Sequence, residues 1–332
     1  MAGREKYLVL GSNSFSGATL IDCLLGEGAA VIGVSRSAEP HAAFLPYRWS
    51  GRDAQFRFAQ LDLNRDLEAI AELVRTERPA YIVNFAAQSM VAESWANPDH
   101  WFTTNVVSTI RLHERLRQMP FLRKYVHVTT PEVYGSTNGV VREDAPFNPS
   151  TPYAVSRAAA DMSLRTFFAQ YGFPVVFTRA ANVFGPGQQL YRIVPRAILA
   201  VKTGRKLRLH GGGVSERSFI DMRDVSRATG LVAREGRPGE AYHISTDRQV
   251  SIRRLVEMIC ERLGARFDDC VEIVAERAGK DAAYRLDSTK IRQELGWTDR
   301  ASLEQGLEDT MAWVDRCIDT LVALPQEYLH KP

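Results

Sequence analysis

The stretch KYLVLGSNSFSG, residues 6–17, decides the first unit of the fold. Its first five residues are an apolar run that predicts a buried strand, and a glycine-containing loop follows directly and opens a helix. In that context Gly11 permits a tight turn, and Gly17 permits close packing of the helix on the strand. The helix N-terminus then offers unpaired N–H groups to an anion. The stretch therefore predicts a site for the pyrophosphate of a dinucleotide; the alternative is an ordinary strand-to-helix turn.

The same alternation continues outward from this stretch through the first half of the chain. Further strands are predicted at 29–34, 56–61, 80–85, 124–130 and 174–179. Helix-length segments lie between them, at 64–76, 98–118 and from Pro152 to Tyr171. Strand and helix in this order predict an α/β fold, a Rossmann-type doubly wound parallel sheet with helices on both faces.

The sequence pattern changes after about residue 180, where glycine-rich loops and an amphipathic helix at 251–264 follow. We therefore predict a dinucleotide-binding domain over 1–180, to which parts of 215–250 return. A smaller C-terminal α/β lobe over 181–332 would bind the substrate. Ligands of such sheets sit beyond the carboxyl ends of the strands, so the active site is expected there.

Composition excludes several classes of partner. Lysine and arginine number 42 against 39 acidic residues, and this net charge of +3 is too weak to indicate a nucleic acid partner. No apolar run approaches the ~18 residues of a membrane span, and the apolar part of MAGREKYLVL is too short for a signal peptide. The four cysteines show no metal-ligand spacing. We therefore expect reduced thiols, no metal site, no membrane partner and a cytoplasmic protein.

The end of the second predicted strand bears on the cofactor. Ser35 stands where an acidic residue would bind the adenosine ribose, and Arg36 follows it. An arginine there can neutralise a 2′-phosphate, so NADP is preferred and NAD stays open; the alternative is a solvated loop cation. Asp62 would accept a hydrogen bond from the adenine amino group; the alternative is that it is the N-cap of the next helix. The cofactor-binding residues expected in these loops are Gly11, Ser14, Phe15, Ser16, Gly17, Ser35, Arg36, Asp62 and Leu63.

The stretch PSTPYAVSRAAADM, residues 149–162, holds Tyr153 and Arg157, one helical turn apart on one face. In many Rossmann enzymes a tyrosine and a lysine at this spacing form the hydride-transfer pair. A fixed positive charge favours the phenolate, so we expect a lowered pKa for Tyr153. Arg157 has the donors and the permanent charge to replace the lysine. We interpret the pair as modified but functional; the alternative is a packed tyrosine and a surface arginine.

Motifs spread over nearly the whole chain carry a family resemblance. They are GSNSFSG, NFAAQSMVAESWANP, YVHVTTPEVYGS, NPSTPYAVSR, TRAANVFGPG, SERSFIDMRDVSRA and ERAGKDAAYRLDSTKIRQELGW. The chain resembles the extended short-chain dehydrogenases/reductases, specifically the nucleotide-sugar 4,6-dehydratases that act on GDP-mannose, dTDP-glucose or CDP-glucose. The glutamate in TPEVYG narrows the match to dehydratases and sugar-acid decarboxylases.

The resemblance implies a lyase of deoxysugar biosynthesis whose cofactor ends each cycle as it began. C4 of the hexose is oxidised, water is lost across C5 and C6, and hydride returns to C6 to give a 4-keto-6-deoxy sugar nucleotide. By resemblance, Glu132 removes the C5 proton that the C4 ketone has made acidic, and Thr130 hydrogen-bonds the hydroxyl being oxidised. Many dehydratases carry an aspartate, acting as an acid, immediately before this glutamate. In this sequence that position is Pro131; GDP-mannose dehydratases also lack the aspartate.

The resemblance also assigns residues around the cofactor and the sugar nucleotide. Ala86 and Ala87 would let the backbone approach the cofactor. Gln88 would touch the hexose, with a buried amide satisfied by the backbone as the alternative. Bidentate pairing suits arginine to phosphate. The residues expected around the diphosphate are Asn182, Arg217 and Arg277, with Arg192 as a weaker candidate. The sequence does not identify the base or the hexose.

In the family, the helices at 98–118 and 153–171 pack against their mates in a four-helix bundle, which implies a homodimer. Phe102, Val106, Ile110 and Phe167 would be buried in that bundle, or else in an intramolecular core.

Two further functions stay open. A sugar-nucleotide decarboxylase or epimerase has the same scaffold. A decarboxylase needs a cation for the C6 carboxylate of its substrate. A 4-epimerase usually lacks a glutamate at the position of Glu132. A non-catalytic NADP-binding sensor would explain Ser14, Pro131 and Arg157. Against the sensor, the tyrosine, the glutamate and the late phosphate-binding stretch are all present together.

Overall fold

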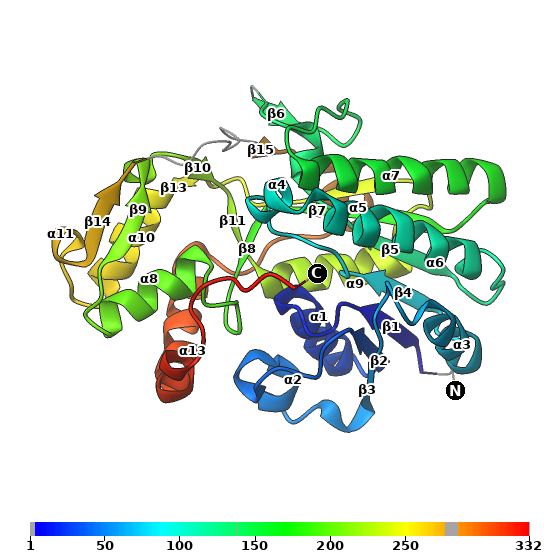
Figure 1. The fold of residues 1–332 in the computed structure, drawn as a ribbon, viewed down its shortest axis with the longest axis horizontal. Coiled ribbons are helices and arrows are strands. Elements are labelled where there is room, and N and C mark those ends of the chain that lie inside the picture. The colour runs from blue at the N-terminus through cyan, green and yellow to red at the C-terminus, as the bar shows by residue number, and fades with distance from the viewer. Residues whose placement is uncertain (1–3, 138, 276–284, 332) are drawn as a thin grey trace.

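The computed structural model describes residues 4–137, 139–275 and 285–331 (Figure 1). Its centre is a seven-stranded sheet in the order β12-β7-β5-β4-β1-β2-β3, in which every neighbouring pair is parallel. The strands are β1 (Lys6–Leu10), β2 (Ala30–Ser35), β3 (Phe56–Gln60), β4 (Tyr81–Asn84), β5 (Lys124–Val128), β7 (Val175–Ala180) and β12 (Ala241–Ile244). The six strands predicted from sequence are confirmed, and the strand order reverses between β1 and β4, where such sheets bind ligands.

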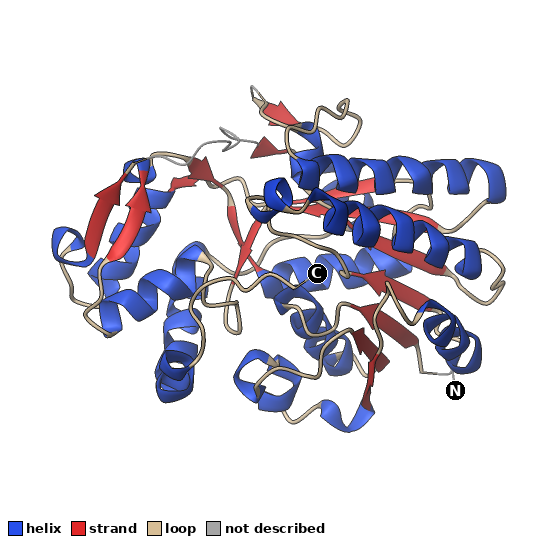
Figure 2. Cartoon of the chain, viewed as in Figure 1, coloured by secondary structure: helices blue, strands red, loops and turns tan. Residues whose placement is uncertain are grey.

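Helices cover both faces of the sheet (Figure 2). On one face, α1 (Phe15–Gly26) and α9 (Met222–Glu235) share a core with Val9 of β1. On the other face, α3 (Leu67–Glu77), α6 (Thr109–Leu116) and α7 (Pro152–Tyr171) share a core with Leu8. Neighbouring residues of a strand point to opposite faces, so the two cores lie back to back across β1. This arrangement confirms the doubly wound α/β fold.

The helix predicted at 98–118 is not one continuous α-helix. It consists of α5 (Pro98–Phe102), a π-helical segment η3 (Thr103–Ser108) and α6. The wider π-helical turn changes which side chains face the sheet, and such segments are frequent at functional sites.

The C-terminal lobe has its own apolar core. The parallel strands β9 (Leu207–His210) and β14 (Val271–Val274) pack with α8 (Ile193–Lys202), α10 (Ile252–Arg262) and α13 (Leu303–Ala323). The remaining elements are η1 (Ala42–Phe44), α2 (Pro46–Trp49), η2 (Asp53–Gln55), α4 (Glu93–Ala96), η4 (Pro131–Tyr134), β6 (Val140–Val141), β8 (Asn182–Phe184), η5 (Gly211–Gly213), β10 (Glu216–Arg217), β11 (Phe219–Asp221), β13 (Val250–Ser251), α11 (Phe267–Cys270), β15 (Arg285–Leu286) and α12 (Thr289–Leu295). No helix among the described residues is both long and apolar enough to cross a membrane.

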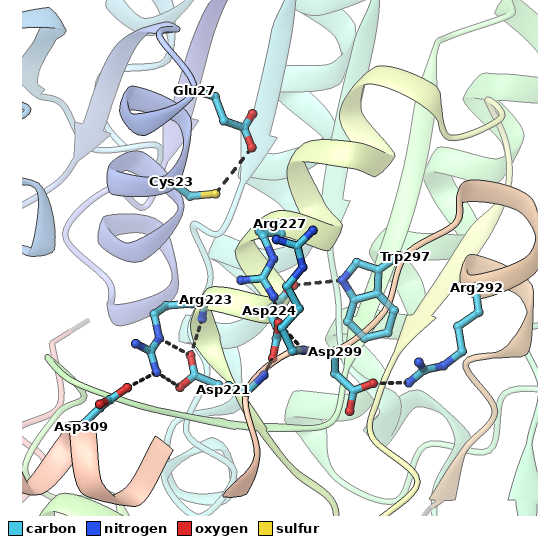
Figure 3. Close-up of polar contacts among 12 residues, drawn as sticks. Cys23, Glu27, Asp221, Arg223, Asp224, Arg227, Arg292, Trp297, Asp299 and Asp309 are labelled. Carbon is cyan, nitrogen blue, oxygen red and sulfur yellow. Dashed lines mark hydrogen bonds and ion pairs between the residues drawn. The ribbon is translucent and has the colours of Figure 1, made fainter. Parts of the chain in front are cut away.

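The start of α9 joins the lobe to the sheet (Figure 3). The Arg223 guanidinium donates to Asp221 and to Asp309 of α13, at 2.7 and 2.5 Å. The buried Asp224 carboxylate accepts the backbone N–H groups of Arg300 and Ala301, at 3.0 and 2.9 Å. Carboxylates that accept several donors hold separate chain segments in fixed positions. The lobe is therefore fixed over the carboxyl ends of the strands.

Candidate active site

The glycine loop after β1 is packed tightly against the end of β4. Gly11 has φ +76°, and a Cβ there would lie 2.8 Å from main-chain atoms of Phe85 and Ala86. Ser14, which replaces the middle glycine, donates from Oγ to the Gly11 carbonyl at 2.7 Å and accepts from the Gly17 N–H at 3.0 Å. Ser14 is therefore the N-cap of α1 and supplies a tie within the loop that glycine does not have.

A cavity of about 350 Å³ opens beyond this loop, over the ends of β1, β2, β3 and β4. A volume of that order is typical of a small-molecule site. Most of the predicted cofactor residues line it: Gly11, Ser14, Ser35, Arg36, Asp62, Leu63, Ala86 and Ala87. Phe15, Ser16 and Gly17 are not among the residues that line it. They form the first turn of α1, where the backbone N–H groups have no partner within the helix.

Two unused polar atoms, one on a residue that lines the cavity and one on α7, fit a dinucleotide. The Asn13 amide nitrogen donates to the Ser37 and Ala38 carbonyls, while its buried Oδ1 accepts no hydrogen bond within the described part of the chain. The buried Nε of Arg157 likewise has no acceptor among the described residues. Ribose hydroxyls both donate and accept, so they match an unused acceptor and an unused donor.

The residues predicted to select the cofactor are already engaged. Ser35 Oγ accepts from the Asn13 N–H at 3.1 Å, so it holds the glycine loop. Arg36 Nη2 donates to the carbonyl of Lys331 at 3.1 Å. Asp62 Oδ1 accepts from the Asn64 N–H at 2.8 Å, in the turn before α3. The N-cap position of α3 is occupied by Asp66, so Asp62 does not cap that helix.

The end of β5 and the start of α7 bring three predicted catalytic residues together. Tyr153 lies on the first turn of α7 and is 9% exposed. Its side chain forms a hydrogen bond with Thr130 and lies within electrostatic reach of Glu132. Thr130 Oγ1 also accepts from the Glu132 N–H at 3.2 Å, which caps η4. Base, hydroxyl and carboxylate therefore lie next to one another after β5, although none of the three is among the residues that line the cavity over β1–β4.

The expected lowering of the Tyr153 pKa is wrong for this structure. Burial raises the pKa of Tyr153, and the Glu132 charge raises it further. Arg157, the Thr130 hydrogen bond and Arg192 lower the pKa, but they do not outweigh the other two causes. The sequence indicated the cation correctly, but it did not give the desolvation and the nearby anion that oppose it.

Arg157 is 3% exposed, so it is not a surface arginine. Its guanidinium donates to the Val128 carbonyl at the end of β5, and its Nη2 lies 3.5 Å from His127 Nε2. Burial, followed by the Arg157 charge, holds the pKa of His127 well below its usual range. The neutral imidazole can therefore share a buried space with a cation.

A second buried cation lies behind this pair. Arg179 Nη2 donates to Asp161 Oδ2 at 2.7 Å, and Thr129 Oγ1 donates to the same oxygen at 3.1 Å. Asp161 lies one helical turn after Arg157, and both Asp161 and Arg179 are fully buried. We call His127, Arg157, Asp161 and Arg179 the buried ionic cluster. It ties α7 to β5 and β7 directly behind the catalytic residues.

Asn105 is a site residue that the sequence analysis missed. It lies in the π-helical segment and is fully buried. Its Oδ1 accepts from the Gln88 N–H at 2.8 Å, and its Nδ2 donates to Gln88 O and Ser156 Oγ, both at 3.0 Å. It therefore fixes the loop after β4 against α7, beside Tyr153. The available signal was an asparagine among β-branched residues in TTNVVST, a poor helical sequence.

Gln88, the residue predicted to touch the hexose, lies apart from the phosphate candidates. It is 3% exposed, and its Nε2 donates to the Lys331 carbonyl at 2.7 Å, which matches the alternative of an amide satisfied by the backbone.

The phosphate candidates lie on the lobe side. Asn182 pairs with Phe219, and its N–H donates to the Ser218 carbonyl at 3.1 Å, which brings it beside Arg217. Arg192 is the N-cap residue of α8, and its charge reaches Tyr153. Arg277 lies outside the described residues.

A tyrosine and a cation at the head of a helix beside a dinucleotide cleft define the short-chain dehydrogenase/reductase class, and the C-terminal lobe marks an extended member. The family model described as GDP-mannose 4,6 dehydratase matches residues 8–310. The chain belongs to this family, among the nucleotide-sugar 4,6-dehydratases.

Named relatives agree with this assignment. The chain is 32% identical to a probable dTDP-glucose 4,6-dehydratase of Sinorhizobium fredii, over 93% of this chain and 92% of the relative. The crystal structure of DesIV, a dTDP-glucose 4,6-dehydratase from Streptomyces venezuelae with NAD bound, is 32% identical with a TM-score of 0.86, covering 94% of this chain and 97% of that one. A Thermotoga maritima UDP-glucose 4-epimerase with UDP-glucose has a TM-score of 0.85 at 27% identity, covering 94% and 99%. Epimerases are thus also near relatives.

Proposed function

We propose that the protein is a nucleotide-hexose 4,6-dehydratase that converts a nucleotide-diphosphate hexose into its 4-keto-6-deoxy form. The observation that carries this proposal is the close grouping of Tyr153, Thr130 and Glu132 after β5, where Thr130 hydrogen-bonds both of the others and the Glu132 charge acts on Tyr153. An epimerase needs the first two residues only. A carboxylate placed beside them suits the removal of a proton next to a new carbonyl group.

The roles of the chain's own residues follow from this geometry. Tyr153, as the phenolate, takes the proton of the C4 hydroxyl, which Thr130 orients. Glu132 then takes the C5 proton. When bound, a nicotinamide dinucleotide supplies the acceptor for the C4 hydride and returns that hydride to C6. Since Pro131 has no proton to give, we assign to Glu132 the delivery of the C5 proton to the leaving C6 hydroxyl, so that one water departs and the carboxylate is restored. When hydride adds to C6, C5 must regain a proton. The proton that Tyr153 took from the C4 hydroxyl balances this gain, and its loss restores the phenolate.

Arg157 supports this chemistry from a fixed position. Its charge opposes the rise in the Tyr153 pKa, and its unused Nε–H suits a hydroxyl of the nicotinamide ribose. A guanidinium is permanently charged, so this support does not depend on pH.

The cofactor class is a nicotinamide dinucleotide, and similar structures contain NAD. They give no support to a preference for NADP. In this chain the Arg36 guanidinium reaches a main-chain carbonyl, so we take NAD as the working cofactor. Titration of the wild type and Arg36→Ala with each dinucleotide tests this choice: a selective loss of NADP affinity in the variant would restore the NADP assignment.

A homodimer through the α5–η3–α6 segment and α7 is part of the proposal. Phe102 is 38% exposed, and Val106 and Ile110 are half-buried, whereas Phe167 lies in the core and does not belong to this surface. Two exposed apolar side chains on one face of α7, Val155 and Met162, extend this surface. Apolar patches of this kind mark interfaces.

The test is mass spectrometry of reaction mixtures. The purified protein meets GDP-mannose, CDP-glucose, dTDP-glucose, UDP-glucose, UDP-N-acetylglucosamine and UDP-glucuronate, each with NAD or NADP. Loss of one water from one hexose is the expected result, and it identifies the nucleotide. Loss of carbon dioxide from the glucuronate would establish a decarboxylase instead. Unchanged mass with an NMR-detected change of configuration would establish an epimerase.

A variant isolates the elimination step. Glu132→Gln is expected to abolish water loss while hydride still passes to the bound dinucleotide, which absorbance at the reduced-nicotinamide wavelength detects. Tyr153→Phe is the matched variant that should lose both steps. Unchanged water loss in Glu132→Gln would overturn the role given to Glu132. If Tyr153→Phe kept every biological output, a non-catalytic sensor would be favoured.

A further inference from the structure

The chain beyond α13 returns to the cofactor cleft. Helix α13 ends at Ala323, and residues 324–331 then run without regular structure toward the carboxyl ends of the strands (Figure 1). Tyr328, Leu329 and Lys331 line the same cavity as the glycine loop. The family model matches residues 8–310, so this segment lies outside the matched range. We call residues 324–331 the strap.

A single carbonyl group of the strap bridges the cleft. The Lys331 carbonyl accepts from Gln88 Nε2 at 2.7 Å and from Arg36 Nη2 at 3.1 Å. Gln88 follows β4 and Arg36 follows β2, and these strands flank β1 on either side. The strap therefore crosses above the glycine loop, where the strand order reverses.

Ring contacts hold the strap on the sheet side of the cleft. The His330 ring stacks on Trp101 with centroids 5.2 Å apart and on His100 with centroids 5.1 Å apart. His330 Nε2 also shares a hydrogen bond of 2.8 Å with His100 Nδ1. Stacked rings with these separations are attractive.

Other contacts hold the strap on the lobe side. Tyr328 packs edge-on against Tyr191 with centroids 5.4 Å apart. Glu327 accepts from Arg196 of α8 at 2.8 Å. Anchors on both the sheet domain and the lobe make the strap a bridge across the cleft.

We propose that the strap closes the dinucleotide cleft and retains the cofactor between turnovers. The cavity persists beneath the strap, so the strap forms a wall of the site and does not fill it. Its anchors are a few polar and ring contacts, which open more easily than a packed core. The inference rests on the proposed function in one respect: a reaction that returns its hydride has no need to release the dinucleotide.

The experiment compares the full chain with a chain that ends at Leu324. The rate of NADH release is measured by stopped-flow fluorescence, with excess NAD as the displacing ligand. Removal of the strap is expected to speed release at least tenfold and to change association less than threefold. Gln326→Ala is the matched control, because Gln326 belongs to the strap but is not among the residues that line the cavity; its release rate should stay within twofold of the wild type.

A second readout does not depend on truncation. Hydrogen–deuterium exchange of the backbone amides of residues 326–331 should slow when NADH is bound to the full chain. If the shortened chain does not fold, the double variant Tyr328→Ala, His330→Ala takes its place in the release experiment and should give the same direction of change.

The outcomes separate the strap from the proposed function. Equal release rates in the full and shortened chains, with NADH bound by both, would overturn the strap alone. Faster association with unchanged release would show a segment that blocks the cleft, and would also overturn retention. No NADH binding by either chain would overturn the dinucleotide site and the strap with it.

Discussion

The dinucleotide cleft has two walls that are held in different ways. The inner wall consists of the glycine loop and the strand ends, and we include in it the catalytic residues after β5 with the buried ionic cluster behind them. Asp161 and Arg179 of that cluster have no exposed side-chain surface. The outer wall is the strap, whose residues are exposed or half-buried and whose anchors are few. Breaking a buried polar contact costs much free energy, because it leaves a buried group without a partner, whereas exposed groups can bond to water instead. The inner wall therefore fixes the chemistry, and the outer wall can open.

The largest expected effect is on the inner wall. Asp161→Asn keeps the shape of the side chain but leaves the Arg179 guanidinium buried without its counter-charge. We expect the free energy of unfolding to fall by about 3–5 kcal/mol, as when one partner of a buried ion pair is removed. Urea denaturation followed by circular dichroism measures it.

A surface pair provides the control for Asp161→Asn. Glu72 pairs with Arg75, and both side chains are more than half exposed. Glu72→Gln is expected to cost less than about 1 kcal/mol, because exposed ion pairs contribute little. Equal losses in the two variants would show that the cluster is no more rigid than the surface.

The second effect is on the cofactor. Gly11→Ala forces a side chain into a left-handed position where a Cβ meets the backbone of β4's end at 2.8 Å. We expect NADH affinity to fall roughly 10- to 100-fold, which corresponds to about 1–3 kcal/mol of strain transferred to the loop. Isothermal titration calorimetry measures the affinity.

Gly28 is the matched glycine for this test. It has φ +83°, and a Cβ there would meet nothing within 4 Å. Gly28→Ala therefore carries the same backbone strain away from the cleft, and it should leave NADH affinity unchanged while lowering stability. A shared loss of affinity would mean that general strain, and not the close approach at Gly11, governs binding.

The third effect is on the pH dependence of the inner wall. The Glu132 charge raises the pKa of Tyr153, so Glu132→Gln is expected to lower that pKa. The phenolate is the active form of a base, and a lower pKa makes it available at lower pH. The rate of hydride transfer to the dinucleotide, measured in a single turnover between pH 6 and 10, should therefore rise at a lower pH than in the wild type. If the rate in Glu132→Gln rose at the same pH as in the wild type, or at a higher pH, the Glu132 charge would not raise the pKa of Tyr153.

The sequence predicted the inner wall better than the outer one. The apolar runs, the glycine loop and the Tyr153–Arg157 spacing are local patterns, and local patterns fix strands, turns and helix faces. The short strand β12, with a histidine in AYHI, was not predicted because it has no clear period of its own.

Other features depended on contacts between distant segments. The π-helical turn at Asn105 forms around hydrogen bonds to Gln88 and Ser156, and the Tyr153 pKa depends on burial. The strap has no periodicity, and its path is set by partners such as Gln88, 243 residues away in sequence. Such placements follow from tertiary packing and are not encoded locally.

The smallest expected effect concerns the outer wall and its response to pH. Burial, followed by the charges of His100 and Arg36, lowers the pKa of His330, while Glu93 opposes the shift. Tyr328 also faces the ring, and Asp99 lies 3.8 Å from His100. Because the docked strap lowers the pKa of His330, docking favours the neutral imidazole. Docking is therefore complete above the ordinary histidine pKa of about 6.5 and weakens as pH falls through that value toward the lower pKa of the docked state.

We expect NADH release to speed up about two- to fivefold between pH 7.5 and pH 5.5 in the wild type, since one proton is linked to strap opening. His330→Phe keeps a ring that stacks on Trp101 but cannot titrate, so its release rate should vary less with pH across this range. The same steep pH dependence in His330→Phe would assign it to another group and would leave the strap closed by contacts that do not depend on the protonation of His330.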